Sequence, residues 1–318
     1  MTNAKEIKKR IRSISNIKKI TKAMEMVAAA KMRRSIEAVL RTRTYANLGW
    51  ETVLNIAESI GADQHIHPLL EKGKGTKTNK EVIILIASNR GLCGGFNSAI
   101  INKAIASAKK HGAETDFIVI GKKGEAVYKR FSYNIISEFV KNDVSPEMKE
   151  VEPVAQLIIQ DFLAKKYDKV LLAYTDFVSS TKQVPRIRQI LPIQIDNEDP
   201  YLGAIGKSEK LGSTKEFIEE KEKKHLEGKR GGYLFKYEPS EREVLDQMLP
   251  RLIEIQIFQG LLESNASEHS ARMMAMHQAT GAANDLVDEL TFFYNKARQA
   301  SITAEIAEIS AGAASLKN

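Results

Sequence analysis

The sequence predicts an α/β protein in which long helices, each suited to a coiled coil, flank a doubly wound sheet domain. Three observations lead to this fold class. Apolar residues follow a heptad spacing through the last forty residues, a basic segment without proline or glycine occupies the N-terminus, and short apolar runs alternate with helical segments between them.

Residues 3–59 predict one long N-terminal helix within a domain spanning residues 1–60. Neither proline nor glycine interrupts the segment before Gly49. A continuous helix of this length extends about 80 Å, which favours a coiled coil over an ordinary globular helix. The apolar residues that recur at steps of three and four are Ile7, Ile11, Ile14, Ile17, Ile20, Met24 and Val27.

The middle of the chain, residues 78–195, is expected to form a Rossmann-like, doubly wound α/β domain with a mainly parallel sheet. A loop containing Gly61 and Pro68 precedes it. Strands are expected at Val82–Ala87, Phe117–Ile120, Asn134–Phe139 and Lys169–Thr175, with Val184–Ile193 as a proline-containing edge strand. Helices are expected at Asn97–Lys110, Glu125–Phe131 and Glu150–Lys165.

Residues 196–239 read as a charged insertion or connection, and helical character returns over residues 240–318. Pro250 predicts a kink or a fresh start in this C-terminal helix. The predicted contact face is Met276, Ala279, Ala283, Leu286, Leu290, Phe293, Ala297, Ala300, Ala304, Ala307, Ala311 and Ala314. Its alanines permit a close approach of a partner helix along the whole tail.

Charge is unevenly distributed over the 318 residues, whose net charge is +8. Residues 1–45 hold thirteen Lys and Arg against three acidic residues, whereas residues 260–318 hold four against seven. The two ends are therefore expected to lie together, or the basic end to meet an acidic partner. No run of 18 apolar residues predicts a membrane span, the N-terminus does not resemble a secretory signal, and one cysteine favours a reducing compartment.

The turn from Asn89 to Asn97 stands where a phosphate-binding loop would follow a strand, yet it matches neither common phosphate-loop pattern. A tight structural turn is the favoured interpretation. Lys122-Lys123 fits an anion site or a solvated turn. Cys93 is expected to be buried, and His65 and His67 form no metal-ligand pattern, so neither a cofactor nor a metal is predicted. His269, after Glu268, is expected at an interhelical or interface contact.

Two other function classes remain open on these residues alone. One is an ATP-binding α/β enzyme with helical arms. The other is a nucleic-acid binder using the basic N-terminal helix. Aromatic residues do not interleave with its basic residues, so base stacking is not indicated and an acidic protein partner is favoured.

Three segments resemble the γ subunit of F-type ATP synthase: ITKAMEMVAAAKMRR from Ile20, NRGLCGGFNSAI from Asn89, and the helical segment from Ala266 to Leu316. The resemblance implies a central-stalk rotor without its own catalytic site, whose terminal helices form an antiparallel coiled coil inside a ring of three α and three β subunits. It also implies a foot on the membrane c-ring, an ε subunit alongside, coupling of ion flow to ATP synthesis, and regulation of ATPase activity. No nucleic acid is implied. The expected location is the cytoplasmic face of a bacterial plasma (inner) membrane, as a peripheral protein.

The same resemblance implies contact residues. Shaft contacts with the catalytic subunits fall at Met24, Arg272, Arg298, Gln299 and Thr303, with Met24 at about the level of Arg298 on the opposite helix. Contacts of the foot with the c-ring fall at Phe235, Tyr237 and Glu238. The sheet is then a scaffold that holds no nucleotide.

Overall fold

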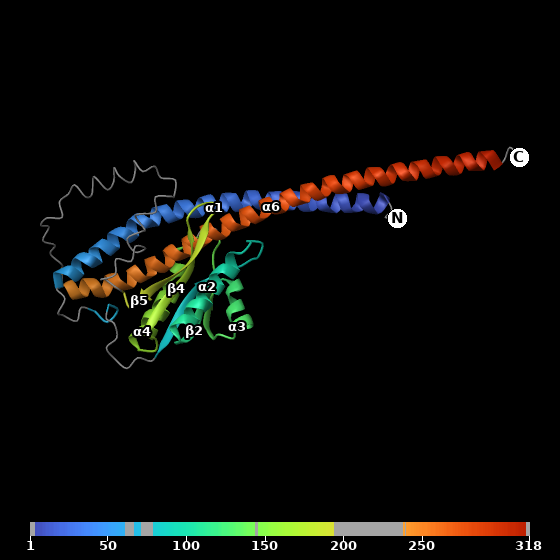
Figure 1. Cartoon of the computed structure of the whole chain (residues 1–318). Coiled ribbons are helices and arrows are strands. Elements are labelled where there is room, and N and C mark those ends of the chain that lie inside the picture. Colours follow the sequence, from blue (N-terminus) through green and yellow to red (C-terminus); the bar gives the residue numbers. More distant parts are fainter. Residues whose placement is uncertain are drawn as a thin grey trace. The chain divides into compact units, whose positions relative to one another are not determined.

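The computed structural model describes residues 4–60, 67–70, 79–143, 146–193, 238 and 240–315. The chain divides into two compact units, each considered by itself. The two-helix unit comprises Met1–Ala29 and Arg272–Asn318, and the sheet unit comprises Ala30–Ala271. Two helices, α1 (Ala4–Ile60) and α6 (Glu241–Ser315), contribute to both units (Figure 1).

The sheet unit contains five strands in the order β3-β2-β1-β4-β5. The strands are β1 (Lys80–Ile86), β2 (Glu114–Ile120), β3 (Ile135–Phe139), β4 (Lys169–Phe177) and β5 (Gln183–Leu191). The helices between them are α2 (Phe96–His111), α3 (Ala126–Phe131) and α4 (Glu152–Leu163), with short 3₁₀ turns at Lys122–Glu125 and Met148–Glu150. Only β5 pairs antiparallel, and it lies at the edge, so the predicted doubly wound, mainly parallel sheet is confirmed.

Both faces of the sheet are covered, which explains the continuous apolar run in β1. Val82, Ile84 and Ile86 join the core that includes α4 and α6, whereas Ile83 and Leu85 join the core formed with α2. All five side chains have no exposed surface. The alternation of Cβ atoms along a strand sends neighbouring residues to opposite faces, so each residue finds an apolar environment.

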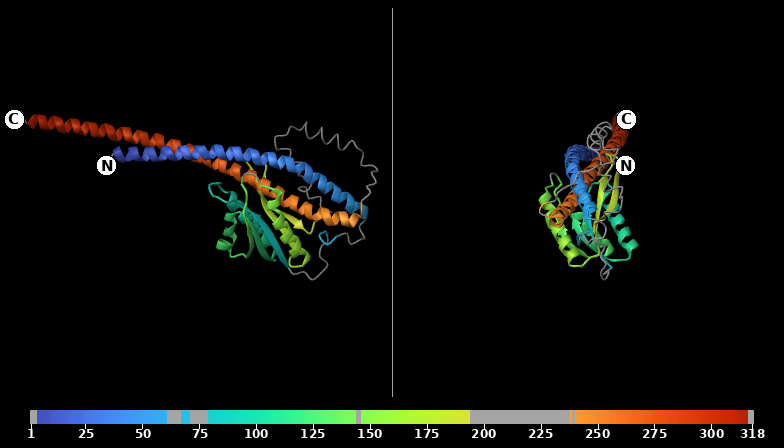
Figure 2. Two further views of the ribbon diagram at one scale, coloured as in Figure 1. Left: turned by 180° about the vertical axis from the view of Figure 1, so that it is seen from behind. Right: turned by 90° about the vertical axis from the view of Figure 1, so that its left-hand side faces the viewer.

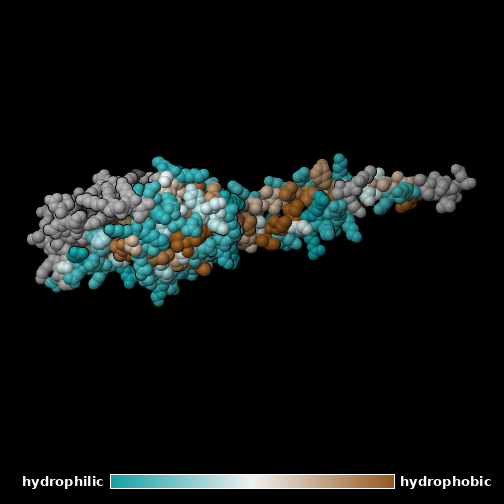
Figure 3. Space-filling model, turned by 90° about the horizontal axis from the view of Figure 1, so that it is seen from below, coloured by the Kyte–Doolittle hydropathy of each residue, from teal (hydrophilic) through white to brown (hydrophobic). Residues whose placement is uncertain are grey.

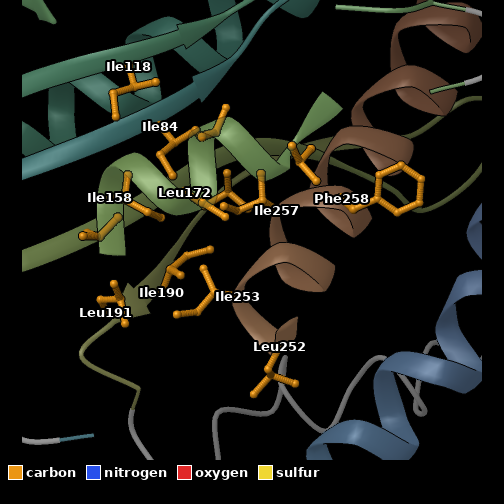
Figure 4. Packing of buried hydrophobic residues seen from close by; sticks show 14 of the residues in the cluster. Ile84, Ile118, Ile158, Leu172, Ile190, Leu191, Leu252, Ile253, Ile257 and Phe258 are labelled. Atoms are coloured by element: carbon orange, nitrogen blue, oxygen red, sulfur yellow. The ribbon is translucent and has the colours of Figure 1, made fainter. Parts of the chain in front are cut away.

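The first part of α6 acts as a helix of the sheet unit. Ile253 and Ile257 pack toward Leu172 of β4 and Ile190 of β5 (Figure 4). All residues from 252 to 270 are buried, and Val39 from the second half of α1 joins the same core. Helix α6 is therefore enclosed around its circumference along this stretch.

The helix α6 continues through Pro250, so the predicted fresh start is wrong. A proline inside a helix removes one backbone hydrogen bond and costs about 3 kcal/mol. Leu249, Leu252 and Ile253 beside it are almost fully buried. Burial of each such side chain contributes roughly 1.5–3 kcal/mol, which offsets the local cost of the proline.

The two-helix unit is an antiparallel pair, as the sequence resemblance implied. The Thr280 hydroxyl donates to the Thr21 hydroxyl at 2.8 Å, and one turn along each helix His277 Nδ1 lies 3.2 Å from Glu25 Oε1. The contacting residue numbers rise on α1 as they fall on α6. Figure 2 shows the two segments side by side, with the C-terminal end of α6 extending past the N-terminal end of α1.

The predicted contact face of α1 is wrong at Ile17, Ile20 and Val27, whereas Met24 is half-buried. Ile17, Ile20 and Val27 are 53%, 58% and 56% exposed. The buried residues of this segment are spaced by seven residues or a multiple of seven, and they are Ile7, Thr21 and Ala28. The helix thus carries two stripes, and the one that faces α6 contains a hydrogen-bonded threonine and a small alanine, which an apolar count overlooks.

The predicted contact face of α6 is half right. Met276 and Ala283 are buried, but Leu286 and Phe293 are each 47% exposed, while Thr280 is buried. The true contact face steps by four and then three residues, where the prediction stepped by three and then four. Because positions seven residues apart are common to both patterns, only every second predicted position was correct.

The predicted pairing of the alanine-rich tail with a second helix of the chain is also wrong. Counting back from Thr21 to Ala4 on α1 moves the opposite position on α6 from Thr280 to Ala297. Every residue from 298 to 310 is exposed. Beyond Ala297, the described part of α6 is a single helix, since α1 is too short to accompany it.

Candidate functional sites: the two-helix unit and the polar joint on the sheet

Three predicted contact residues lie together on the unaccompanied end of α6. Arg298, Gln299 and Thr303 are all exposed. Gln299 and Thr303 are one turn apart on the same side of the helix, where the Thr303 hydroxyl donates to the Gln299 carbonyl at 2.9 Å. Arg298 precedes Gln299, so its exposed side chain leaves the helix about 100° away, and an exposed guanidinium is suited to binding a carboxylate.

The other two predicted shaft residues, Met24 and Arg272, are half-buried. The expectation that Met24 lies level with Arg298 is wrong. Residue Glu25 contacts His277, and Arg298 lies roughly 30 Å further along α6 at 1.5 Å per residue. Met24 and Arg298 are accordingly at different heights along the two-helix unit.

Large apolar side chains are exposed along both helices of this unit, and sequence reasoning missed their role because it assigned several of them to the inner contact face. Figure 3 shows such hydrophobic residues among hydrophilic ones on the surface of the helical part. Large apolar side chains gathered on an exposed surface mark a contact with another protein. Those exposed here are Ile17, Ile20, Met26, Val27, Leu286, Phe292, Phe293, Ile302, Ile306 and Ile309.

The predicted foot residues are only partly described. Phe235 and Tyr237 lie outside the described residues, as does nearly all of the 196–239 segment. Glu238 is described and exposed.

The Gly-rich turn after β1 is filled by its own side chains. Asn97 Oδ1 accepts from the Ser88 backbone N–H at 3.0 Å, and Asn97 Nδ2 donates to Cys93 Sγ at 3.3 Å. Cys93 is 2% exposed, so its predicted burial is confirmed. Gly121, in the next turn, has φ +100°, and a Cβ there would lie 2.4 Å from the Ala87 carbonyl oxygen, so glycine is required by the close approach of two backbones.

A polar joint, defined as Ser264 to Ser270 of α6 with its partners, fastens α6 to the carboxyl ends of the strands. At its centre, Lys141 Nζ lies 2.5 Å from Glu268 Oε2, and both side chains have no exposed surface. Lys141 follows β3, and its ammonium also donates to the Ala87 carbonyl at the end of β1, at 3.3 Å. One buried ion pair therefore ties together two strand ends and the helix.

Neutral hydrogen bonds surround this ion pair. The Ser264 hydroxyl accepts from the Thr175 N–H, and the Ser267 hydroxyl donates to the Thr175 carbonyl, each at 3.1 Å. The Ser270 hydroxyl donates to the Ser180 carbonyl in the β4–β5 turn at 2.6 Å. Serines of α6 therefore bind the backbone both near the end of β4 and in the turn that follows it.

The loop after β3 makes two further bonds of the joint. Asn265 Nδ2 donates to the Asn142 carbonyl at 3.0 Å, and His269 Nε2 lies 2.7 Å from the Asp143 carbonyl. The expected interface contact of His269 is thus with this loop. No signal in the local sequence could have revealed the joint, because its polar residues have the composition of a solvent-exposed helix face.

Burial also affects the ionisation of nearby groups in the sheet unit. Burial first, and the Glu263 carboxylate second, raise the pKa of Tyr174 on β4 far above its usual range. Tyr174 is therefore a neutral phenol beneath α6. In the two-helix unit, the hydrogen bond from Lys22 lowers the pKa of Glu25.

Within the part of the chain that the structure describes, no helix is both long enough and apolar enough to cross a membrane.

These features define a stalk-type protein, in which a long helical pair with an exposed contact surface is continuous with helices of an α/β domain. The chain belongs to the ATP synthase family, since the family model described as ATP synthase matches residues 3–316. Its curated relatives include the ATP synthase gamma chain of Maridesulfovibrio salexigens, 37% identical over the whole of both chains. That of Herpetosiphon aurantiacus is 40% identical over 99% of each chain.

Solved structures share the fold. A chain of the Euglena gracilis mitochondrial ATP synthase, in an assembly titled OSCP/F1/c-ring, aligns with a TM-score of 0.61 at 18% identity, covering 98% of this chain and 94% of that chain. A chain of the Tetrahymena thermophila enzyme, titled central stalk/c-ring, aligns with a TM-score of 0.56 at 22% identity, covering 82% and 99%.

Proposed function

We propose that this chain is the central-stalk rotor of a proton-translocating F-type ATP synthase. It couples rotation of a membrane c-ring to conformational change in the catalytic α/β ring. The observation that carries the proposal is an antiparallel helical pair ending in a single exposed helix, in a chain that matches gamma chains over its full length.

The structure suggests how such a shaft would work. Beyond Ala297 one helix about 10–12 Å across enters the ring, narrower than a pair. Its exposed apolar residues, such as Ile302 and Ile306, make non-directional contacts with an apolar collar, so no rotational position is strongly favoured. Rotation then changes which catalytic subunit the asymmetric shaft contacts, which couples shaft angle to nucleotide affinity.

Polar contacts bias one catalytic subunit at a time. Arg298, with Gln299 beside it, donates to a carboxylate-bearing loop of one catalytic subunit. Because Met24 lies roughly 30 Å from the level of Arg298, we assign Met24 and Arg272 to a second, lower contact. Thr303 belongs to the upper contact with Gln299.

The remaining partners follow from the same proposal. The foot at Phe235, Tyr237 and Glu238 contacts the c-ring, and the ε subunit lies beside the sheet unit. The chain itself has no catalytic site and holds no nucleotide, and it regulates ATPase activity and ion flow through its contacts. As part of a membrane-associated complex, it resides at the cytoplasmic face of a bacterial inner membrane.

Arg298→Ala in the assembled complex tests the proposal. ATP synthesis and hydrolysis should both fall by at least about tenfold, because a hydrogen bond to a charged group contributes at least ~1.5 kcal/mol. Lys296→Ala is the matched control, since it removes the same charge from an exposed position about 200° around the helix. Equal effects of the two variants would contradict the assigned role of Arg298.

Titration of the isolated chain with ATP separates the rotor from the nucleotide-binding enzyme. Saturable binding at micromolar ATP would contradict the proposal. Salt-sensitive nucleic-acid binding that survives at physiological ionic strength would favour the third class.

A further inference from the structure

We propose that the polar joint is the lock that transmits torque between α6 and the sheet unit, with Lys141 and Glu268 as its positioning residues. The inference rests on the proposed rotor function. It assigns a role to residues that lie outside the predicted contacts with other subunits.

The location of the joint along the chain is the first argument. The joint occupies Ser264–Ser270, and α6 passes from the sheet unit into the two-helix unit between Ala271 and Arg272. Any twisting force on the second half of α6 therefore reaches the joint before it reaches the apolar packing around Ile253 and Ile257.

The distribution of bonds around the helix is the second argument. At 100° per residue, the six bonded side chains of the joint spread over about 260° of the circumference. Five of them bind backbone groups of three separate segments, namely the end of β4, the β4–β5 turn and the loop after β3, and the sixth binds the Lys141 side chain. A helix held on three sides cannot roll without breaking bonds on every side. The bonded side chains are Ser264, Asn265, Ser267, Glu268, His269 and Ser270.

The chemistry of the contacts is the third argument. Apolar packing is non-directional, so an apolar helix face can slip by small rotations at little cost. Hydrogen bonds weaken steeply as their angles change, and a buried charge that loses its partner is strongly unfavourable. The Lys141–Glu268 pair, with both side chains fully buried, therefore resists rotation more than its net contribution to folding would suggest.

A buried ion pair is often no more stabilising than well-packed apolar residues of similar volume. The contribution of the Lys141–Glu268 pair to torque transmission can therefore be tested separately from its contribution to folding. Replacing both partners by methionine leaves the joint filled but removes the directional contact, so folding is retained while resistance to rotation falls.

The test uses the complete ATP synthase in proteoliposomes, assembled with the K141M/E268M chain. Unloaded ATP hydrolysis should stay within about twofold of that of the wild-type complex. The protons pumped per ATP hydrolysed, measured against a rising opposing proton gradient, should fall at least threefold, and ATP synthesis with it.

Two further variants keep the result interpretable. The control K80M/E114M removes an ion pair of similar length from an exposed site on the sheet, where the side chains are 41% and 66% exposed, and should pump normally. The swapped variant K141E/E268K restores a directional charged contact at the joint and should recover part of the lost coupling. A single E268M variant leaves the lysine buried without its partner and should lower assembly instead.

The outcomes separate the inference from the function on which it rests. If the complex with the unaltered chain neither synthesises ATP nor pumps protons, the rotor proposal is wrong. If that complex is coupled and the K141M/E268M complex pumps the same number of protons per ATP under load, the proposed torque-transmitting role of the polar joint is wrong.

Discussion

Gly260 offers a quantitative check on how closely α6 lies against the sheet. A Cβ at this position would approach Leu172 Cδ2 to 2.8 Å, and Tyr174 Cγ to 3.5 Å. Carbon atoms in contact are normally about 3.5–4.0 Å apart. Gly260→Ala therefore requires Leu172 or the helix to move.

The change in the free energy of unfolding caused by Gly260→Ala follows from two opposing effects. Alanine is about 1 kcal/mol better than glycine inside a helix. Overpacking a buried site costs typically 1–3 kcal/mol. We expect Gly260→Ala to be neutral to about 2 kcal/mol destabilising.

Gly49→Ala is the matched control in the same unit. A Cβ on Gly49 would lie 3.9 Å from Leu252 Cδ1, which is ordinary van der Waals contact. This variant should gain the helix preference of about 1 kcal/mol without a clash. The two variants should differ by about 1–3 kcal/mol in the free energy of unfolding.

Urea unfolding of the purified chain, followed by far-ultraviolet circular dichroism, provides the measurement. Leu172→Val removes the clashing methyl, so the cost of Gly260→Ala should shrink in its presence, and a double-mutant cycle measures that coupling. If Gly260→Ala is as stabilising as Gly49→Ala, the close approach of α6 to β4 is refuted.

Two further predictions concern the two-helix unit. The pKa of Glu25 is lowered in the folded pair, so its ionised form stabilises that pair at neutral pH. This contribution is lost as the pH falls below 4.5, the ordinary pKa of the group in the unfolded chain. The difference in unfolding free energy between the wild type and Glu25→Gln should therefore shrink in acid, and a difference independent of pH would contradict the assignment. Truncation after Ala297 removes a segment whose residues 298–310 are exposed, so the thermal unfolding midpoint of the helical pair should stay within a few degrees, and a large drop would show that the tail packs on the chain itself.

The strands and the interior helices could be predicted from local patterns. A continuous apolar run as short as Ile83–Ile86 fits a strand covered on both faces of a sheet, and all four of its side chains are indeed buried. The edge position of β5 followed from Pro185 and Pro192, since proline lacks the donor that a central strand needs. Its antiparallel direction was not predicted and is decided by the structure.

The contact face between the terminal helices could not be predicted in the same way. On α1, Ile17 and Ile20 form a regular apolar stripe, but Thr21 faces the partner helix. Periodicity shows that a helix has an apolar face. It does not show whether that face meets a helix of the same chain or a different protein.

The polar joint was equally hidden, because Ser264, Glu268 and His269 have the composition of a solvent-exposed helix face. Only the positions of Lys141, Thr175 and Asp143, brought close by the sheet, make their burial favourable. Each of these partners is more than 80 residues away in the chain, and local sequence carries no record of such pairings.

For this protein, the sequence by itself determined the kinds of elements and their order, because helix and strand periods are properties of neighbouring residues. The tertiary structure alone decided which face of each long helix is inward and where α6 is held against the sheet. Those choices depend on the register between distant segments, where one step of three or four residues exchanges a buried side chain for an exposed one.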